Sequence, residues 1–151
     1  MNKILAILIV TILAALGPAP VVQAENGIAP DDIILPGDSV ALEDFIWLKR
    51  PLVVFADSPN DPRYIQQMEY ITDRLDALAD RDVGVLTDTD PRGGSALRTK
   101  LRPRGFMLTL IGKDGSVYLR KPAPWSVREI SRVIDKMPLR QQEIRDRRGD
   151  S

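Results

Sequence analysis

The chain contains 151 residues, with 21 basic and 21 acidic side chains but no cysteine and no histidine. The lack of cysteine excludes disulfides, thiolate metal ligands and cysteine nucleophiles. The lack of histidine excludes imidazole acid or base chemistry and histidine-ligated metal centres. The balanced charge argues against nucleic acid as the main partner, and the length suits one ordinary domain.

The start of the chain has the pattern of a secretory signal peptide over residues 1–24. One charge, Lys3, precedes an apolar run from Ile4 to Leu16, which is shorter than the roughly 20 residues that a bilayer span needs. We therefore expect cleavage between Ala24 and Glu25, with an uncleaved anchor as the alternative. The mature protein is then periplasmic or secreted and has no stable membrane anchor.

The mature chain divides into three predicted segments. Residues 25–41 form a polar N-terminal leader, residues 42–140 form one folded domain, and residues 141–151 form a charged flexible tail. At the end of the leader, Asp38 or Ser39 is expected to cap a short helix that continues through Phe45. The tryptophan after this helix, Trp47, is predicted to be a core anchor, because its side chain buries a large area.

The strongest pattern is a strand, a tight turn and a helix that follow one another within residues 50–63. Leu52 to Ala56 is a continuous apolar run, which is typical of a strand buried on both faces. Turn-forming residues follow, and Asp61-Pro62 combines a helix N-cap with a proline at the first helical position. In an α/β sheet, ligands tend to bind where a strand ends beside a helix N-terminus.

A second strand is predicted at residues 83–86, parallel to the first. Apolar side chains recur at intervals of three and four from Ile65 to Leu78, which predicts a helix between the two strands. A right-handed crossover would place the strands side by side. Because both runs end in aspartates, we expect four carboxylates at the carboxyl edge of the sheet. They are Asp57, Asp61, Asp88 and Asp90.

The second half of the chain predicts a short helix, a hairpin and a longer helix. Ser95 can cap the short helix. An Asp-Gly pair in the loop 112–115, between two apolar runs, is a strong hairpin signal. Ser126 starts a capping box for a helix from Val127, and Pro138 is expected to kink or end this helix before a frayed tail.

The predicted order from Arg50 onward is β-α-β-α-β-β-α, which resembles the thioredoxin fold. The stretch V-F-A-D-S-P-N-D-P resembles a thioredoxin active-site turn with Pro59 and Pro62 in the places of the two cysteines. Met107 stands in the place of the cis-proline. Together, R-P-L-V-V-F-A, V-L-T-D-T-D and F-M-L-T-L-I-G-K-D-G resemble the domain of unknown function 4174, or DUDES-type domain, of exported bacterial and vertebrate extracellular proteins.

This resemblance implies an α/β fold, a thioredoxin-like three-layer sandwich with a mixed β-sheet, in a cysteine-free exported bacterial member of the family. It supplies no catalytic mechanism, so we assign no catalytic residue, cofactor or metal. Thiol-disulfide activity is not expected, because a mixed disulfide requires cysteine.

Two classes of function remain. The favoured class is a redox-inactive binding or interaction module, whose partner is an unidentified periplasmic or extracellular protein or small ligand. The alternative is a cation-binding protein or hydrolase that uses the four aspartates, although capping of turns and helices is their simplest role. We also predict that Arg104 reaches back to Asp57 or Asp88, since a guanidinium would offset the repulsion between converging carboxylates.

Overall fold

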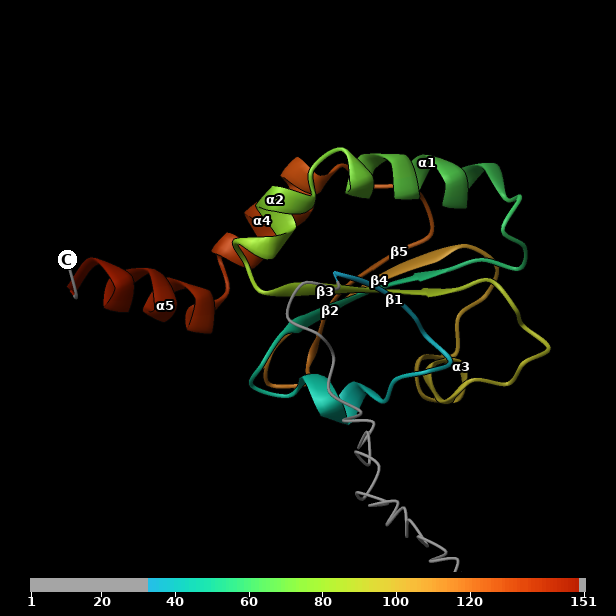
Figure 1. Ribbon diagram of the computed structural model, residues 1–151, viewed down its shortest axis with the longest axis horizontal. Helices are drawn as coiled ribbons and strands as arrows, with labels where there is room; N and C mark the ends of the chain where they lie inside the picture. The colour runs from blue at the N-terminus through green and yellow to red at the C-terminus, as the bar shows by residue number, and fades with distance from the viewer. Residues whose placement is uncertain (1–32, 150–151) are drawn as a thin grey trace, which may run out of the picture.

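The computed structural model describes residues 33–149, which are built around one mixed five-stranded sheet (Figure 1). The strands are β1 (Ile34–Pro36), β2 (Arg50–Phe55), β3 (Val83–Asp88), β4 (Met107–Ile111) and β5 (Val117–Lys121). Their order across the sheet is β1-β3-β2-β4-β5, with β2 parallel to β3 and antiparallel to β4. The predicted parallel pair and hairpin are confirmed. The signal peptide and its cleavage site lie outside the described residues.

Helices cover both faces of the sheet. They are the 3-10 helix η1 (Leu42–Phe45) and the α-helices α1 (Pro62–Thr72), α2 (Leu75–Ala79), α3 (Ala96–Leu101), α4 (Val127–Asp135) and α5 (Pro138–Gly149). In Figure 1, α1, α2 and α4 lie on one side of the sheet, η1 and α3 lie on the other, and α5 extends outward beyond α4. This arrangement confirms the predicted α/β three-layer sandwich. Among residues 33–149, no helix combines the length and apolar character that a bilayer crossing requires.

Each face of the sheet has its own apolar core, and β2 contributes to both. Every residue of β2 is buried. Leu52 and Val54 pack in the core beneath α1, α2 and α4, whereas Val53 and Phe55 pack in the core with η1 and α3. Successive side chains of a strand point to opposite faces, so a strand that is apolar throughout must be covered on both sides.

The predicted caps at Asp61, Ser95 and Ser126 are confirmed, but the predicted cap at Asp38 or Ser39 is wrong, because η1 starts after Ala41 and the Ser39 hydroxyl instead donates to the carbonyl oxygen of Pro36 at 2.8 Å. Asp61 Oδ1 accepts a hydrogen bond from the backbone N–H two residues later at 2.9 Å, and Pro62 opens α1. Ser95 caps α3 through the N–H of Arg98 at 3.2 Å, and Ser126 forms the capping box of α4. These caps depend on neighbouring residues only, which is why local sequence was sufficient to find them.

The predicted single helix after Pro62 is interrupted between α1 and α2. The hydroxyl of Thr72 donates to the carbonyl oxygens of Met68 and Glu69 at 2.9 and 3.1 Å, and such bonds compete with helical geometry. The break lets α2 turn so that Leu78 is fully buried in the core.

Trp47 is not a core residue, so that prediction is wrong. Its side chain is 66% exposed. Phe45, which is 1% exposed, takes the core position, and its carbonyl oxygen accepts hydrogen bonds from the N–H groups of Leu48 and Lys49, both at 2.9 Å. This tight turn directs the residues between η1 and β2 outward.

The residues after Pro138 form helix α5 rather than the frayed segment expected from the sequence. Proline has no N–H to lose at the start of a helix, so Pro138 opens α5 instead of ending α4. Arg50 Nη2 and Lys113 Nζ each lie 2.9 Å from Glu143 Oε1 and hold α5 in place. Burial raises the pKa of Glu143, but hydrogen bonds from Lys113 and Arg50 outweigh burial and bring this pKa to about 2.

Candidate functional site

The carboxyl edge of the sheet contains a buried ion pair between Asp88, the last residue of β3, and Arg98 of α3. Arg98 Nε donates to Asp88 Oδ1 at 2.8 Å. The side chain of Asp88 is 5% exposed and that of Arg98 is 10% exposed. Arg98 Nη2 also donates to the carbonyl oxygen of Ala56 at 2.7 Å. The guanidinium lies 5.4 Å from the centre of the Phe55 ring. One side chain thus ties α3 to the ends of β2 and β3.

Ser95 explains why Arg98, and not Arg104, meets Asp88. Its hydroxyl donates to Asp88 Oδ2 and accepts from the N–H of Arg98, so the start of α3 is anchored on the carboxylate. The first turn of α3 then carries Arg98 to the other carboxylate oxygen. Arg104 is exposed, and within residues 33–149 no ion pair joins it to Asp57 or Asp88. The predicted role of Arg104 is therefore wrong. The spacing of Ser95 and Arg98 after Asp88 was the signal that could have identified the pair.

The other predicted aspartates make local bonds. Asp61 accepts from Arg63 Nε at 3.0 Å and from Nη2 at 2.7 Å, and this side-chain hydrogen bonding lowers the pKa of Asp61. Asp90 Oδ1 accepts from the N–H of Arg92 at 3.0 Å, which is an Asx turn. Asp57 is exposed. The capping interpretation accounts for these contacts.

A polar cavity of about 280 Å³ adjoins this edge, and Asp88 and Asp90 line it together with Asp38. Asp57 and Asp61 do not line it, so the structure brings together only two of the four predicted carboxylates. Among residues 33–149, no three acidic side chains are arranged so that they could hold a metal ion.

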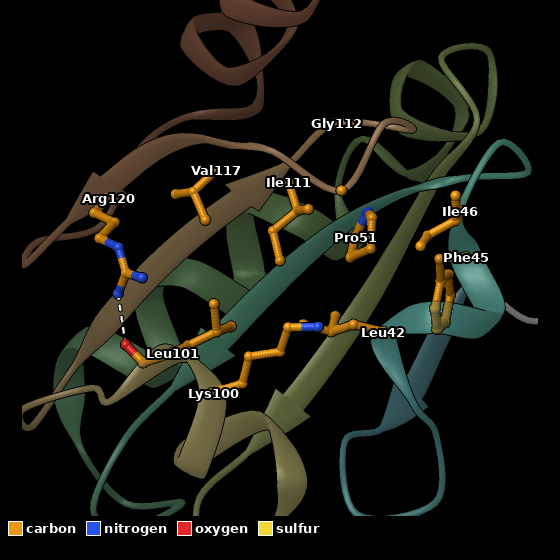
Figure 2. Close-up of a pocket in the computed structure, with 11 residues that line it drawn as sticks. Leu42, Phe45, Ile46, Pro51, Lys100, Leu101, Ile111, Gly112, Val117 and Arg120 are labelled. Atoms are coloured by element: carbon orange, nitrogen blue, oxygen red, sulfur yellow. Dashed lines mark hydrogen bonds between the residues drawn. The ribbon is translucent and has the colours of Figure 1, made fainter.

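A second cavity, of about 250 Å³, lies at the opposite end of β2, on the face covered by η1 and α3 (Figure 2). Its walls are mainly apolar. Leu42 and Phe45 come from η1, Leu101 comes from α3, and Ile111 and Val117 come from the β4–β5 hairpin. The lining is completed by Ile46, Pro51, Lys100, Gly112, Gly115 and Arg120. We call this space the apolar cavity.

The polar groups of the apolar cavity are two cations. Lys100 pairs with Glu43 of η1. Arg120 Nη1 donates to the carbonyl oxygen of Leu101 at 2.6 Å, the bond drawn as a dashed line in Figure 2. None of the lining residues carries a carboxylate or a hydroxyl. This set of groups favours the binding of an apolar group over acid–base or nucleophilic chemistry.

Five large apolar side chains in the turn between η1 and β2 and at the start of β5 are exposed to solvent, and we call them the apolar rim. They are Ile46, Trp47, Leu48, Val117 and Tyr118, with exposed fractions between 40% and 68%. Ile46 and Val117 line the apolar cavity, whereas Trp47 and Tyr118 line a neighbouring hollow of about 260 Å³. Gly112 borders both spaces. Sequence reasoning missed this region because it assigned the tryptophan to the core.

Trp47 is held in an unfavourable conformation. Its φ angle is 65°, in the left-handed region, and its N–H donates to the carbonyl oxygen of Lys113 at 2.7 Å. The left-handed region costs an L-residue roughly 1–2 kcal/mol, and glycine is the residue that avoids this cost. Backbone strain of this kind is concentrated at functional sites. The fold therefore presents a strained, exposed indole beside an apolar cavity.

The architecture has counterparts among solved structures of low sequence identity. The reduced 2-Cys peroxiredoxin of Plasmodium vivax is 19% identical, with a TM-score of 0.54 over 68% of this chain and 85% of that chain. Prx1a of Plasmodium yoelii is 20% identical, with a TM-score of 0.53 over 70% of this chain and 85% of that chain. The fold is thus thioredoxin-like, in a chain that contains no cysteine.

Residues 41–143 match the family described as a domain of unknown function (DUF4174), and the chain belongs to this family. Coiled-coil domain-containing protein 80 of Danio rerio is 31% identical over 133 residues, which include 68% of this chain. The chain spans only 15% of the length of that relative. The family predicted from the sequence motifs is confirmed.

Proposed function

We propose that this protein is an exported, redox-inactive binding module that holds a protein partner at the apolar cavity and the apolar rim. The exposed apolar side chains around a preformed apolar cavity are the observation that supports this function. Export is supported by the signal-peptide pattern of residues 1–24. An insulin-reduction assay should show no turnover above background, because no mixed disulfide can form without cysteine.

The size of the apolar cavity favours a single side chain of a partner over a whole small molecule. Pockets for drug-sized ligands span about 300–1,000 Å³. The apolar cavity, at about 250 Å³, falls below that range. It exceeds the roughly 150 Å³ of an apolar cavity that accommodates benzene. One leucine, methionine, phenylalanine or tryptophan therefore fits, which is how anchor residues bind at protein interfaces.

The alternative function, cation binding or hydrolysis by aspartates, has weaker support. Asp88 is engaged by Arg98 and Ser95, and Asp61 is engaged by Arg63. A carboxylate already neutralised by a guanidinium is a poor cation ligand and a poor general base.

The first experiment tests whether the apolar cavity accepts an apolar group. The chain has two tryptophans, so the Trp125→Phe background leaves Trp47 as the only indole. We expect the apolar dye anilinonaphthalene sulfonate to bind this protein and to receive excitation energy from Trp47. Ile46→Asp should weaken dye binding at least tenfold. Ile65→Asp is the matched control, because Ile65 is exposed to a similar extent, 46% against 40%, but lies on α1 across the sheet.

The second experiment concerns the partner itself. A photoreactive residue placed at Trp47 should capture one protein in the native host. The capture should disappear with Ile46→Asp and persist with Ile65→Asp. Equal behaviour of the two aspartate variants, in dye binding or in capture, would contradict the proposed function.

A further inference from the structure

Two residues that line the apolar cavity, Val117 and Arg120, belong to β5, which is an edge strand of the sheet (Figure 2). An edge strand has one side whose backbone groups are free to pair with another extended chain. Val117 and Tyr118 of β5 belong to the apolar rim and are 44% and 41% exposed. Arg120 and Lys121 complete the strand, which contains two cations and no anion. The edge therefore combines an open ladder, apolar surface and positive charge.

We infer that the partner segment is an extended acidic peptide that pairs with β5 as an added strand and places one large apolar side chain in the apolar cavity. This inference rests on the proposed function and specifies the partner. An added strand lies about 4.8 Å from its neighbour, and its alternate side chains point to the same face. Val117 and Arg120 of β5 line the apolar cavity, so side chains of the added strand on that face lie next to it.

The charges near β5 favour an acidic segment. Arg120 donates to a carbonyl oxygen, and no carboxylate among residues 33–149 pairs with it. Lys121 lies 4.2 Å from the centre of the Trp125 ring. The nearby cation Lys100 already has Glu43 as its partner. Acidic side chains of a bound segment would thus supply the first carboxylates for Arg120 and Lys121.

The same charges disfavour a second copy of this chain as the occupant. Pairing of β5 with β5 would bring two cations from each strand to one seam, without a carboxylate from either strand. Like charges across paired strands are destabilising. Charged edge strands also protect many proteins from unwanted pairing. If the charges of β5 only prevented unwanted pairing, neither acidic nor basic peptides would bind. A charge-reversal experiment therefore distinguishes this protective role from the binding of an acidic segment.

The test uses a panel of labelled peptides in which glutamate alternates with an apolar residue, with leucine, methionine, phenylalanine or tryptophan as the anchor. A matching panel has lysine in place of glutamate. Binding is measured by fluorescence anisotropy, and hydrogen exchange of the β5 amides is measured with and without the best peptide. We expect at least tenfold tighter binding of the acidic panel and slower exchange across Val117–Lys121, because an added strand protects the edge amides.

Charge reversal sharpens the result. Arg120→Glu should weaken the acidic peptides at least tenfold and improve the lysine peptides, whereas Arg74→Glu, at an exposed arginine in the turn between α1 and α2, should change neither. Equal binding of the two panels, binding without protection of β5, or no binding by either panel would overturn the acidic-strand inference. If Ile46→Asp still weakens dye binding at least tenfold in that case, the proposed function stands and only the partner class is wrong.

Discussion

The two ends of β2 have opposite characters. At the carboxyl end, Arg98 and Ser95 satisfy the buried carboxylate of Asp88 from within the fold. At the amino end, the apolar cavity and the apolar rim leave large apolar side chains without a covering element. The carboxyl end resembles an active site in sequence but is part of the scaffold. The amino end, which looked like core in sequence, is the surface that a partner can bind.

The largest expected effect concerns the scaffold end. Arg98→Ala leaves Asp88 buried without its counter-ion, and loss of one partner from a buried pair costs about 3 to 5 kcal/mol of folding free energy. Urea unfolding of the two proteins measures this difference. Arg104→Ala is the control and should change stability by less than about 0.5 kcal/mol, because its side chain is exposed. Equal losses of stability from Arg98→Ala and Arg104→Ala would contradict the structural role assigned to the Arg98–Asp88 pair.

The next effect is a pH dependence at the amino end, where Glu143 binds Arg50 and Lys113. The pKa of Glu143 is lowered from 4.5 to about 2, so its stabilisation is complete above pH 4.5 and is lost as the pH falls toward 2. The carboxylate is partly open to solvent, so we expect a loss of about 1 to 2 kcal/mol over that range. Thermal melts at several pH values measure it. Glu143→Gln should make the melts less dependent on pH in this window, and an unchanged dependence would show that other carboxylates dominate.

A smaller effect of opposite sign is expected at Trp47. Trp47→Gly relieves a left-handed backbone worth roughly 1–2 kcal/mol, and the greater freedom of glycine in the unfolded chain offsets about 0.5–1 of it. Stability in urea unfolding should therefore stay the same or rise by up to about 1.5 kcal/mol. A large loss of stability would mean that the indole is structural after all.

The smallest effect tests whether the carboxyl edge binds a cation. Asp57→Asn should change stability by less than about 0.5 kcal/mol, because Asp57 is exposed. Calcium should leave the melting temperature of both proteins unchanged. A bound ion at a hundred times its dissociation constant would instead add about 2.7 kcal/mol. A calcium-dependent rise in melting temperature that disappears in Asp57→Asn would show that the carboxyl edge of the sheet binds the cation.

The sequence by itself determined the elements whose causes are local. The N-caps at Asp61, Ser95 and Ser126, the hairpin at 112–115 and the doubly buried strand β2 depend on residues within a few positions of one another. The family motifs and the absence of cysteine were equally readable, so the thioredoxin-like fold without thiols followed from the residues alone.

The tertiary structure decided which side chains meet across long separations. Arg98, rather than Arg104, reaches Asp88 because the capped start of α3 is anchored on that carboxylate. Helix α5 is joined to the start of β2 by the ion pair between Glu143 and Arg50, which is far away in sequence. Trp47 is exposed because Phe45 already fills the core. Composition and periodicity identify apolar and charged residues, but only the packed chain determines which of them find partners inside and which remain for a partner outside.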